Sequence, residues 1–208
     1  MGDWIYGFAT HELREEFIKK YGYGPAEHDY MKHYQVKPGD IYVEGGANVG
    51  RTAFLAQAMG AKAVMIEPSP LNIPLIQKEM VDGKHSNAVL VPKALSGESK
   101  IAFFILAGGK SDRLGERGDK ITPVKVDTLP NILGELEITK VNLFACDIEG
   151  QEVEVVKQLD PKVELHLAIA SYHLGDDKKV LEQIMNPLKE KGYKTVTYEE
   201  GIVFASAL

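Results

Sequence analysis

A glycine-rich bend between a short apolar run and a helical segment constrains the fold of this chain most. Residues 41–44 are typical of a buried strand, and the chain then turns through Gly-Gly-Ala-Asn-Val-Gly at 45–50. A helical pattern follows, and a second apolar run at 62–66 ends at an acid, Glu67. This order predicts a βαβ unit whose first turn lets backbone and free helix amides approach a ligand. A carboxylate at the end of the second strand can accept hydrogen bonds from both hydroxyls of a ribose, so the unit predicts a nucleoside site.

The rest of the chain continues the alternation of strands and helices. We expect strands at 41–44, 62–66, 88–92, 141–146, 164–171, 193–198 and 202–206, β-segments at 100–106 and 121–126, and helices at 10–20, 26–34, 50–59, 70–81, 150–158 and 176–191. Alternating elements indicate an α/β fold, with a mostly parallel seven-stranded sheet and helices on both faces. The short link at 199–201 predicts a C-terminal antiparallel hairpin. We expect one domain over 1–208, with 1–38 as an N-terminal helical lid segment and 39–208 as a Rossmann-like core.

Composition narrows the class of protein. The chain has 208 residues and a formal net charge of -6, a size typical of one domain and a charge that argues against a nucleic-acid partner. No apolar stretch approaches the length of a membrane span, and the N-terminus lacks the pattern of a secretory signal. The single cysteine, Cys146, excludes an internal disulfide and suits a reducing compartment. We therefore expect a cytoplasmic protein without a membrane partner, and the composition leaves the oligomeric state open.

The spacing of the bend distinguishes between nucleoside ligands. In the dinucleotide fingerprint Gly-x-Gly-x-x-Gly, aligning the last glycine with Gly50 puts Ala47 at the middle glycine, which weakens an NAD site. The pattern Glu-x-Gly-x-Asn-x-Gly fits better, with Glu44, Gly46, Asn48 and Gly50. This pattern resembles motif I of class I S-adenosylmethionine (SAM) methyltransferases. An NAD-dependent oxidoreductase and an ordinary strand-to-helix turn with loop glycines remain the alternatives.

Further motifs narrow the resemblance to one family. In chain order they are Val-Lys-Pro-Gly-Asp at 36–40, Glu-Pro-Ser-Pro at 67–70, Lys-Ala-Leu-Ser at 93–96 and Asp-Ile-Glu-Gly at 147–150. Together with the bend, the set resembles the FkbM-type methyltransferases over about residues 36–173. Three positions depart from that pattern: Glu44 replaces the usual aspartate, Ala145 a lysine, and Ser171 an acid. The first change keeps the charge, whereas the other two leave the acceptor and the catalytic detail open.

The resemblance implies a class I methyltransferase fold and SAM as the cofactor. Glu44 is expected near the ammonium group of the cofactor, and Glu67 at the ribose hydroxyls, although Glu67 could instead cap the next helix. Gly46 and Gly50 would let the backbone approach, and Asn48 can adopt a left-handed conformation in the turn. The adenine is expected beside Pro68, Lys93, Ala94 and Leu95.

Three residues beyond the bend are candidates for catalysis. Asp147 is expected to face the methyl group of the cofactor, and Glu149 either caps the following helix or contacts the acceptor. His173, just after the strand at 164–171, has a pKa suited to removing a hydroxyl proton, or it bonds to the backbone. The same three residues offer oxygen and nitrogen ligands for a metal. No tight spacing of histidine or cysteine supports that alternative, so no metal is predicted.

The acceptor is expected beside a polar, glycine-rich loop at 107–119, interpreted as a gate. Its candidate contacts are Ser111, Asp112 and Arg113, and further candidates are Tyr30, Tyr172 and His173. The sequence thus predicts a SAM-dependent methyltransferase that acts on the hydroxyl of a small-molecule or sugar-like acceptor. The alternative is a catalytically silent module that binds SAM or a nucleoside.

Overall fold

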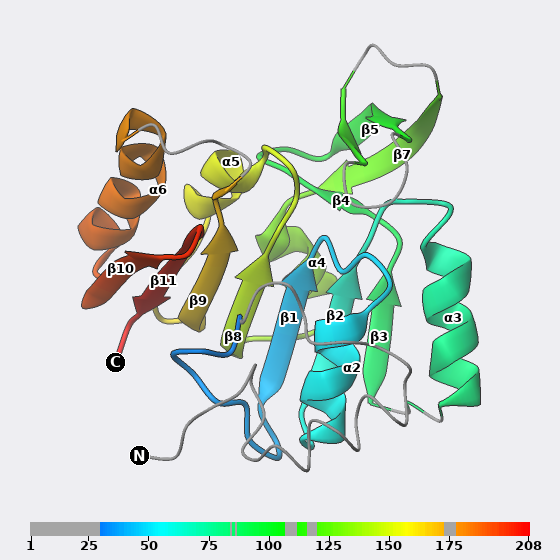
Figure 1. The fold of residues 1–208 in the computed structure, drawn as a ribbon, viewed down its shortest axis with the longest axis horizontal. Helices are drawn as coiled ribbons and strands as arrows, with labels where there is room; N and C mark the ends of the chain where they lie inside the picture. Colours follow the sequence, from blue (N-terminus) through cyan, green and yellow to red (C-terminus); the bar gives the residue numbers. More distant parts are fainter. Residues whose placement is uncertain (1–29, 84, 86, 107–111, 116–119, 173–177) are drawn as a thin grey trace.

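The computed structural model describes residues 30–83, 85, 87–106, 112–115, 120–172 and 178–208. Within them, seven strands form one main sheet in the order β10-β11-β9-β8-β1-β2-β3 (Figure 1). All neighbours pair in parallel except β11, which is antiparallel to both β9 and β10. The strands are β1 (Ile41–Gly45), β2 (Lys62–Ile66), β3 (Ala88–Val91), β8 (Val141–Cys146), β9 (Glu164–Ala170), β10 (Thr195–Glu199) and β11 (Ile202–Ser206). The predicted α/β class, the seven-stranded sheet and the C-terminal hairpin are confirmed.

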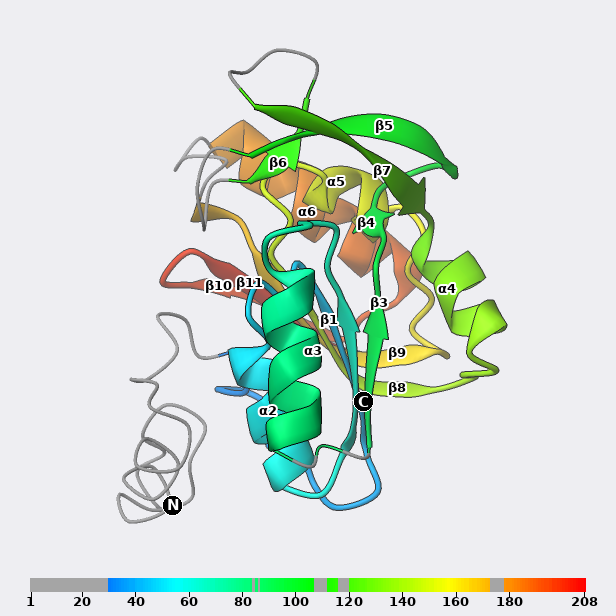
Figure 2. The same ribbon diagram turned by 90° about the vertical axis from the view of Figure 1, so that its right-hand side faces the viewer.

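Helices cover both faces of the main sheet (Figure 2). On one face lie α2 (Arg51–Ala58) and α3 (Ile73–Asp82). The other face carries α4 (Leu129–Glu135), α5 (Glu152–Val156) and α6 (Lys178–Lys191). Within the described part of the chain, no helix combines the length and the apolar character that a bilayer span requires.

Successive side chains of each strand point to opposite faces of the main sheet, so the core consists of two layers. In β1, Tyr42 packs in one cluster with Phe54 of α2, whereas Val43 packs in the other with Ile132 of α4. The parallel strands are buried on both faces and therefore consist of almost continuous apolar runs. Those runs are the reason why the bounds of the parallel strands β2 and β8 match the predicted ones.

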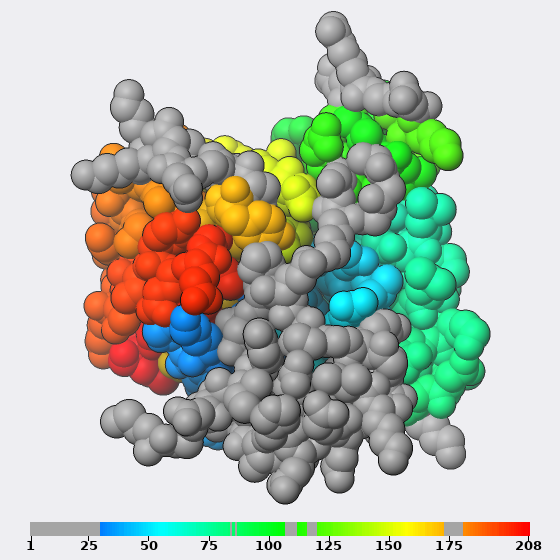
Figure 3. Space-filling model, in the orientation of Figure 1, coloured from blue at the N-terminus to red at the C-terminus, as the bar shows by residue number. Residues whose placement is uncertain are grey.

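A second, smaller sheet stands over the carboxyl ends of the main strands (Figures 1 and 2). It contains β4 (Ala94–Leu95), β5 (Lys100–Ile105), β6 (Arg113–Leu114) and β7 (Ile121–Asp127), in the order β4-β7-β5-β6. In Figure 3 its green residues lie above the teal residues of α3, opposite the orange and red C-terminal elements. The sequence predicted β5 and β7 but not the two short strands. Because β6 pairs with β5, the expected loop at 107–119 is structured in its middle, and its segments 107–111 and 116–119 lie outside the described residues.

Other local predictions need correction. The described end of the predicted helix at 26–34 is a turn and a bend followed by chain without regular structure. Tyr30 and Met31 in this turn are buried in the same core cluster as Phe54 of α2. Helix α4 was not predicted at all, and α3 begins three residues later than expected. The predicted helix at 10–20 and the rest of the expected lid up to residue 29 lie outside the described residues.

Candidate active site

A cavity of about 390 Å³ lies where the strand order reverses. From β1 the chain continues through β2 to β3 on one side, and later through β8 to β9 on the other. Open α/β sheets bind ligands at such a switch point, beyond the carboxyl ends of the strands. Residues that follow β1, β2, β8 and β9 line the cavity, and side chains from the small sheet close it from above. The fold therefore gathers the predicted strand-end residues around one space.

The turn after β1 forms the floor of this cavity. Gly46 has φ 76°, and a Cβ at this position would lie 1.8 Å from the carbonyl oxygen of Asp147. Asn48 has φ 53°, the left-handed conformation expected for it. Gly50, with φ 78°, caps α2, and a Cβ there would lie 2.7 Å from the ring of Phe54. A side chain at 46 would collide with the backbone of Asp147, and one at 50 with the side chains of Phe54 and Met65. Both positions also have a positive φ, so the turn depends on both glycines.

Glu44 lies buried behind this turn and lines the cavity. Its Oε2 accepts a hydrogen bond of 3.1 Å from the backbone N–H of Ala53. Burial raises the pKa of Glu44 to about 8, although hydrogen bonds from Thr52 and Ala53 lower it in part. The side chain therefore holds a proton at neutral pH unless a cation lies beside it.

Glu67 links the turn after β1 to the turn after β2. Its Oε2 accepts from the backbone N–H of Asn48 and its Oε1 from that of Ser69, each at 2.8 Å. The amide of Asn72 donates to Oε1 at 3.4 Å. Burial raises the pKa of Glu67 to about 7, because desolvation outweighs these hydrogen bonds. The carboxylate thus lines the cavity and also fixes the two turns against each other.

Asp147 brings together three segments that are distant in the sequence. The hydroxyls of Tyr30 and Tyr172 both donate to its Oδ2, at 2.8 Å and 2.6 Å. Burial, followed by the charge of Asp147, raises the pKa of Tyr30 well above its usual value. Burial and the hydrogen bond to Asp147 raise the pKa of Tyr172 in the same direction. Both phenols therefore stay protonated and act as donors to the carboxylate, inside the same cavity.

Glu149 lines the cavity and has φ 55°, an uncommon conformation for a residue with a side chain. The backbone N–H groups of this turn donate hydrogen bonds to another acid, Glu152. Oε1 of Glu152 accepts from Ile148 N–H at 2.7 Å, and Oε2 accepts from Gly150 N–H at 2.9 Å. Glu152 is fully buried and begins α5. Glu152 thus accepts the backbone N–H groups on both sides of Glu149, and the role of Glu149 stays a prediction.

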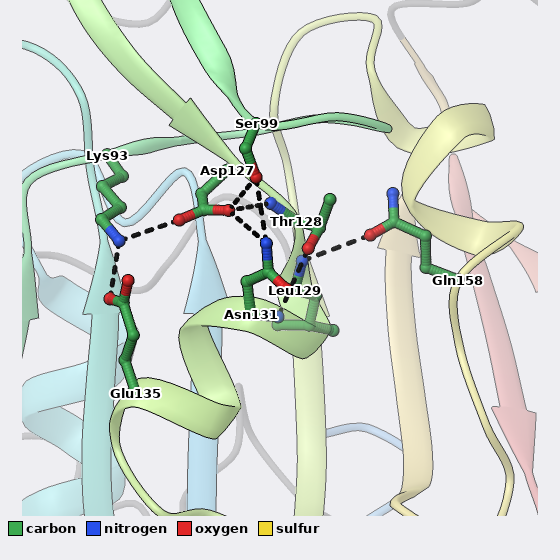
Figure 4. Close-up of polar contacts among 8 residues, drawn as sticks. All are labelled: Lys93, Ser99, Asp127, Thr128, Leu129, Asn131, Glu135 and Gln158. Carbon is green, nitrogen blue, oxygen red and sulfur yellow. Dashed lines mark hydrogen bonds and ion pairs between the residues drawn. The ribbon is translucent and has the colours of Figure 1, made fainter.

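Lys93 lies outside the cavity, in contrast to its expected place beside the adenine. Its ammonium group pairs with Asp127 at 2.9 Å and with Glu135 at 2.6 Å (Figure 4). Burial disfavours the charge of Asp127, but hydrogen bonds from Ser99, Lys93 and neighbouring groups outweigh it and hold the pKa below its usual range. This network joins the start of the small sheet to α4. The neighbouring Pro68, Ala94 and Leu95 do line the cavity.

We expect the substitution Lys93→Met to destabilise the fold and to leave ligand binding in the cavity unchanged. Loss of the charged donor leaves Asp127 without one of its partners, which costs about 1 kcal/mol or more. The melting temperature should fall by about 2–4 °C in a thermal unfolding scan. Lys100→Met is the matched control, because Lys100 is exposed and pairs with exposed Glu98, so its melting temperature should stay the same. Equal effects of both substitutions would contradict the structural role of Lys93.

The residues expected to contact the acceptor are distributed unevenly. Asp112 lines the cavity, and its Oδ2 accepts a hydrogen bond of 3.1 Å from the hydroxyl of Ser69. Arg113 is exposed on β6 and does not line the cavity. Ser111 and His173 lie outside the described residues. Within those described, no group of three or more histidine, cysteine or acidic side chains is arranged to hold a metal ion.

Sequence reasoning missed several residues of the cavity, of which Arg51, Phe104 and Asn72 bear most on its chemistry. Arg51, the first residue of α2, lines it and directly follows Gly50, so its place in the motif was a usable signal. Phe104 of β5 lines it while its neighbour Phe103 is exposed, as the alternation of a strand requires. Asn72 donates to Glu67 from the residue before α3, a contact that no local pattern indicates.

Comparison with known proteins identifies the family of this chain. The methyltransferase FkbM domain matches residues 44–195, which is most of the chain. No curated protein matches the sequence. Among solved structures, the methyltransferase FkbM from Methylobacillus flagellatus KT has a TM-score of 0.57 at 15% identity, over 85% of this chain and 47% of that one. This chain therefore spans about half the length of that protein.

Two further structures are similar over almost the whole chain. The precorrin-6y C5,15-methyltransferase from Geobacter metallireducens GS-15 has a TM-score of 0.51 at 11% identity, over 95% of this chain and 87% of that one. A Streptococcus mutans protein solved with S-adenosylhomocysteine (SAH) has a TM-score of 0.52 at 12% identity, over 95% and 97% of the two chains. At such identities the likeness shows the fold, and the domain match adds the family. The chain belongs to the FkbM family of S-adenosylmethionine-dependent methyltransferases.

Proposed function

We propose that the protein methylates a hydroxyl group of a small-molecule or sugar-like acceptor. The observation that carries this proposal is the surroundings of Asp147. Two hydroxyls already donate to its Oδ2, at 2.8 Å and 2.6 Å, at the edge of the turn that forms the cavity floor. A carboxylate that accepts O–H donors inside a cavity can accept an acceptor's hydroxyl in the same way.

The residues of the cavity fit SAM. Gly46 keeps the floor open, because any side chain there would collide with the backbone of Asp147. Glu44 would face the ammonium group, and Arg51 would face the carboxylate of the amino-acid end. Glu67 would accept the ribose hydroxyls, as the acid at the end of the second strand does in related nucleoside sites. Pro68, Ala94 and Leu95 would offer apolar surface to the adenine.

When bound, SAM supplies a methyl group activated by the positive sulfonium. The chain's own residues then have three tasks. Asp147 would orient the hydroxyl of the acceptor and take its proton as the oxygen is methylated. Tyr30 and Tyr172, whose pKa values are raised, would stay protonated and hold the carboxylate in place. Phe104 and Leu114 would exclude water from above, so that most of the rate gain comes from positioning in a dry space.

Calorimetry combined with product analysis tests the proposal. The purified protein should bind SAM and SAH at one site and should not bind NAD. Incubation with SAM and a panel of neutral polyols and sugars should give an O-methylated product by mass spectrometry. Binding without product across a broad panel would favour the silent binding module. Saturable binding of NAD without SAM would contradict the methyltransferase assignment, and methylation confined to amines would contradict the choice of a hydroxyl.

Binding of the cofactor should release a proton, because of the raised pKa values of Glu44 and Glu67. With pKa values of about 8 and about 7, both acids are partly protonated at neutral pH. An ammonium group beside Glu44 favours its charged form, so the proton leaves on binding. The affinity for SAH should therefore rise with pH from about 6 to 8, by up to tenfold per unit if one whole proton is released.

Calorimetry in two buffers of different ionisation enthalpy measures this proton directly. The heat of SAH binding should differ between the buffers at pH 7, and the difference should shrink above about pH 8.5. The variant Glu44→Gln carries no titrating group at this position. The SAH binding that it retains should release fewer protons than that of the unmodified protein. Identical heats in both buffers for the unmodified protein would contradict the linkage.

A further inference from the structure

We infer that Tyr42 is a positioning residue for the cofactor site, because its hydroxyl can donate to the ionised carboxylate of Glu44 when the ammonium group of SAM is bound. This inference rests on the proposed function, which places Glu44 beside that ammonium group. It deepens the proposal by adding a core residue that does not itself line the cavity.

Tyr42 carries a polar group at a place where the ring alone would fill the core. Its side chain is fully buried and packs in one cluster with Ala53 and Phe54 of α2. Its hydroxyl makes no hydrogen bond of ordinary geometry with the described residues. A buried donor without a partner destabilises the protein, and native cores rarely contain one. The hydroxyl is therefore expected to serve a state in which a neighbour accepts it.

Strand geometry makes Glu44 that neighbour. The two residues are separated by one position in β1, and alternate residues of a strand point to the same side of the sheet. On that side, the backbone N–H of Ala53 donates to Oε2 of Glu44 at 3.1 Å, and the hydroxyl of Thr52 also bonds to this acid. The hydroxyl of Tyr42 lies close enough to lower the pKa of Glu44, although this contact is looser than an ordinary hydrogen bond.

The neighbouring strands offer Glu44 only apolar side chains. Met65 of β2 and Ala145 of β8 lie directly opposite it in the two registers. The other titratable side chains around it line the same cavity, and among them the charge of Asp147 opposes ionisation of Glu44. They are Tyr30, Arg51, Glu67 and Asp147. Hydrogen-bond donors at the start of α2 and on β1 are thus the groups that favour the charged form from beneath.

An ammonium group beside Glu44 brings this donor into use. It favours the ionised carboxylate, which is a stronger hydrogen-bond acceptor than the protonated acid. Burial raises the pKa of Tyr42 well above its usual value, so the phenol stays protonated and can only donate. A hydrogen bond to the ionised oxygen would give the phenol its partner. Tyr42 would thereby help Glu44 to lose its proton as the cofactor binds.

The variant Tyr42→Phe tests this role, because it keeps the ring and removes only the hydroxyl. Since the hydroxyl lowers the pKa of Glu44, its loss should raise that pKa above the present value of about 8. Loss of a hydrogen bond to a charged group should reduce the SAH affinity at pH 7 by about tenfold in calorimetry. The range over which the affinity rises with pH should extend upward by about one unit, so that variant and unmodified protein converge above about pH 9.

Thermal unfolding without ligand shows whether the variant is folded. Because the hydroxyl is buried without a partner, Tyr42→Phe should melt at the same temperature as the unmodified protein or slightly above it. At pH 7, a given concentration of SAH should raise the melting temperature of the variant less than that of the unmodified protein.

Tyr193→Phe is the matched control. It removes another buried phenol, which donates to the backbone oxygen of Glu164 at 3.0 Å at the opposite end of the main sheet. This variant should keep the SAH affinity and its dependence on pH. In a protein that already carries Glu44→Gln, the further change Tyr42→Phe should alter the SAH affinity by less than about twofold at any pH, because Tyr42 acts through Glu44.

Two results would overturn the inference. A loss of affinity that is the same at every pH would assign Tyr42 to packing, and an unchanged affinity at pH 7 would show that the hydroxyl has no role in binding. Either result leaves the proposed function standing on SAH binding and on methylated product. Failure of the unmodified protein to bind SAH would instead remove the proposed function, and the inference with it.

Discussion

Replacing Glu67 with alanine is expected to reduce the affinity for SAM and SAH by about 100-fold or more. A carboxylate that accepts two ribose hydroxyls contributes about 1.5–3 kcal/mol for each hydrogen bond to the charged group. Two such bonds correspond to a loss of at least about 3 kcal/mol, or two orders of magnitude. Calorimetry on the purified variant, with SAH as the titrant, measures the loss directly.

The same substitution also tests the structural role of Glu67. Without the carboxylate, the N–H groups of Asn48 and Ser69 lose their acceptor, so the two turns should loosen. A thermal unfolding scan must therefore accompany the titration, to show that the variant is folded at the temperature of the experiment. Asp82→Ala, an exposed acid on α3, serves as the control and should change neither quantity. Undiminished SAH binding by folded Glu67→Ala would remove the ribose assignment.

The variant Asp147→Asn should lose most of its turnover and keep its cofactor affinity. Asparagine keeps one oxygen that can accept from Tyr30 or Tyr172, but it cannot take a proton from the acceptor. General-base assistance contributes roughly 10²–10⁴-fold, so kcat should fall by about that factor. SAH affinity should stay within about threefold. Initial rates, measured as methylated product by mass spectrometry, and SAH calorimetry give the two numbers.

Tyr172→Phe separates the function of Asp147 from the packing around it. This variant removes one donor to Oδ2 and leaves the carboxylate intact. Its rate should fall much less than that of Asp147→Asn, because the carboxylate that would take the proton is still present. Full activity of Asp147→Asn would contradict its role as a base. A large loss of SAH affinity in the same variant would assign Asp147 to the cofactor instead.

The main sheet could be predicted from the sequence because buried parallel strands consist of continuous apolar runs between turns. The strand β2, Lys62–Ile66, is an example, bounded by Gly60 and by Glu67-Pro68. Helix α4 was missed despite a local signal. Thr128 accepts from the backbone N–H of Asn131 at 3.3 Å, and Pro130 lies in the first turn, a pattern typical of a helix start. The two-residue strands β4 and β6 are too short to show any period.

Residues of the candidate site could be predicted where the topology of the sheet places them at the cavity. They could not be predicted where the direction of a side chain decides whether the residue lines the cavity. Gly46, Glu67 and Asp147 follow strands whose carboxyl ends meet, so the sheet itself brings them together. Lys93 shares its segment with Ala94 but turns to Asp127 and Glu135, partners that only the folded chain supplies. Glu152 resembles an exposed acid in a short helix, yet it is fully buried and closes the turn after β8.

The small sheet means that two separate parts of the chain form the cavity. The floor of the cavity comes from the turns of the main sheet, whereas its ceiling comes from β4, β5 and β6, which the chain inserts between β3 and β8. Evolution or engineering can exchange side chains such as Phe104 and Leu114 in this insert and leave the glycine turn untouched. Under the proposed function, changes in this insert would alter the choice of acceptor while the methyl donor stays the same.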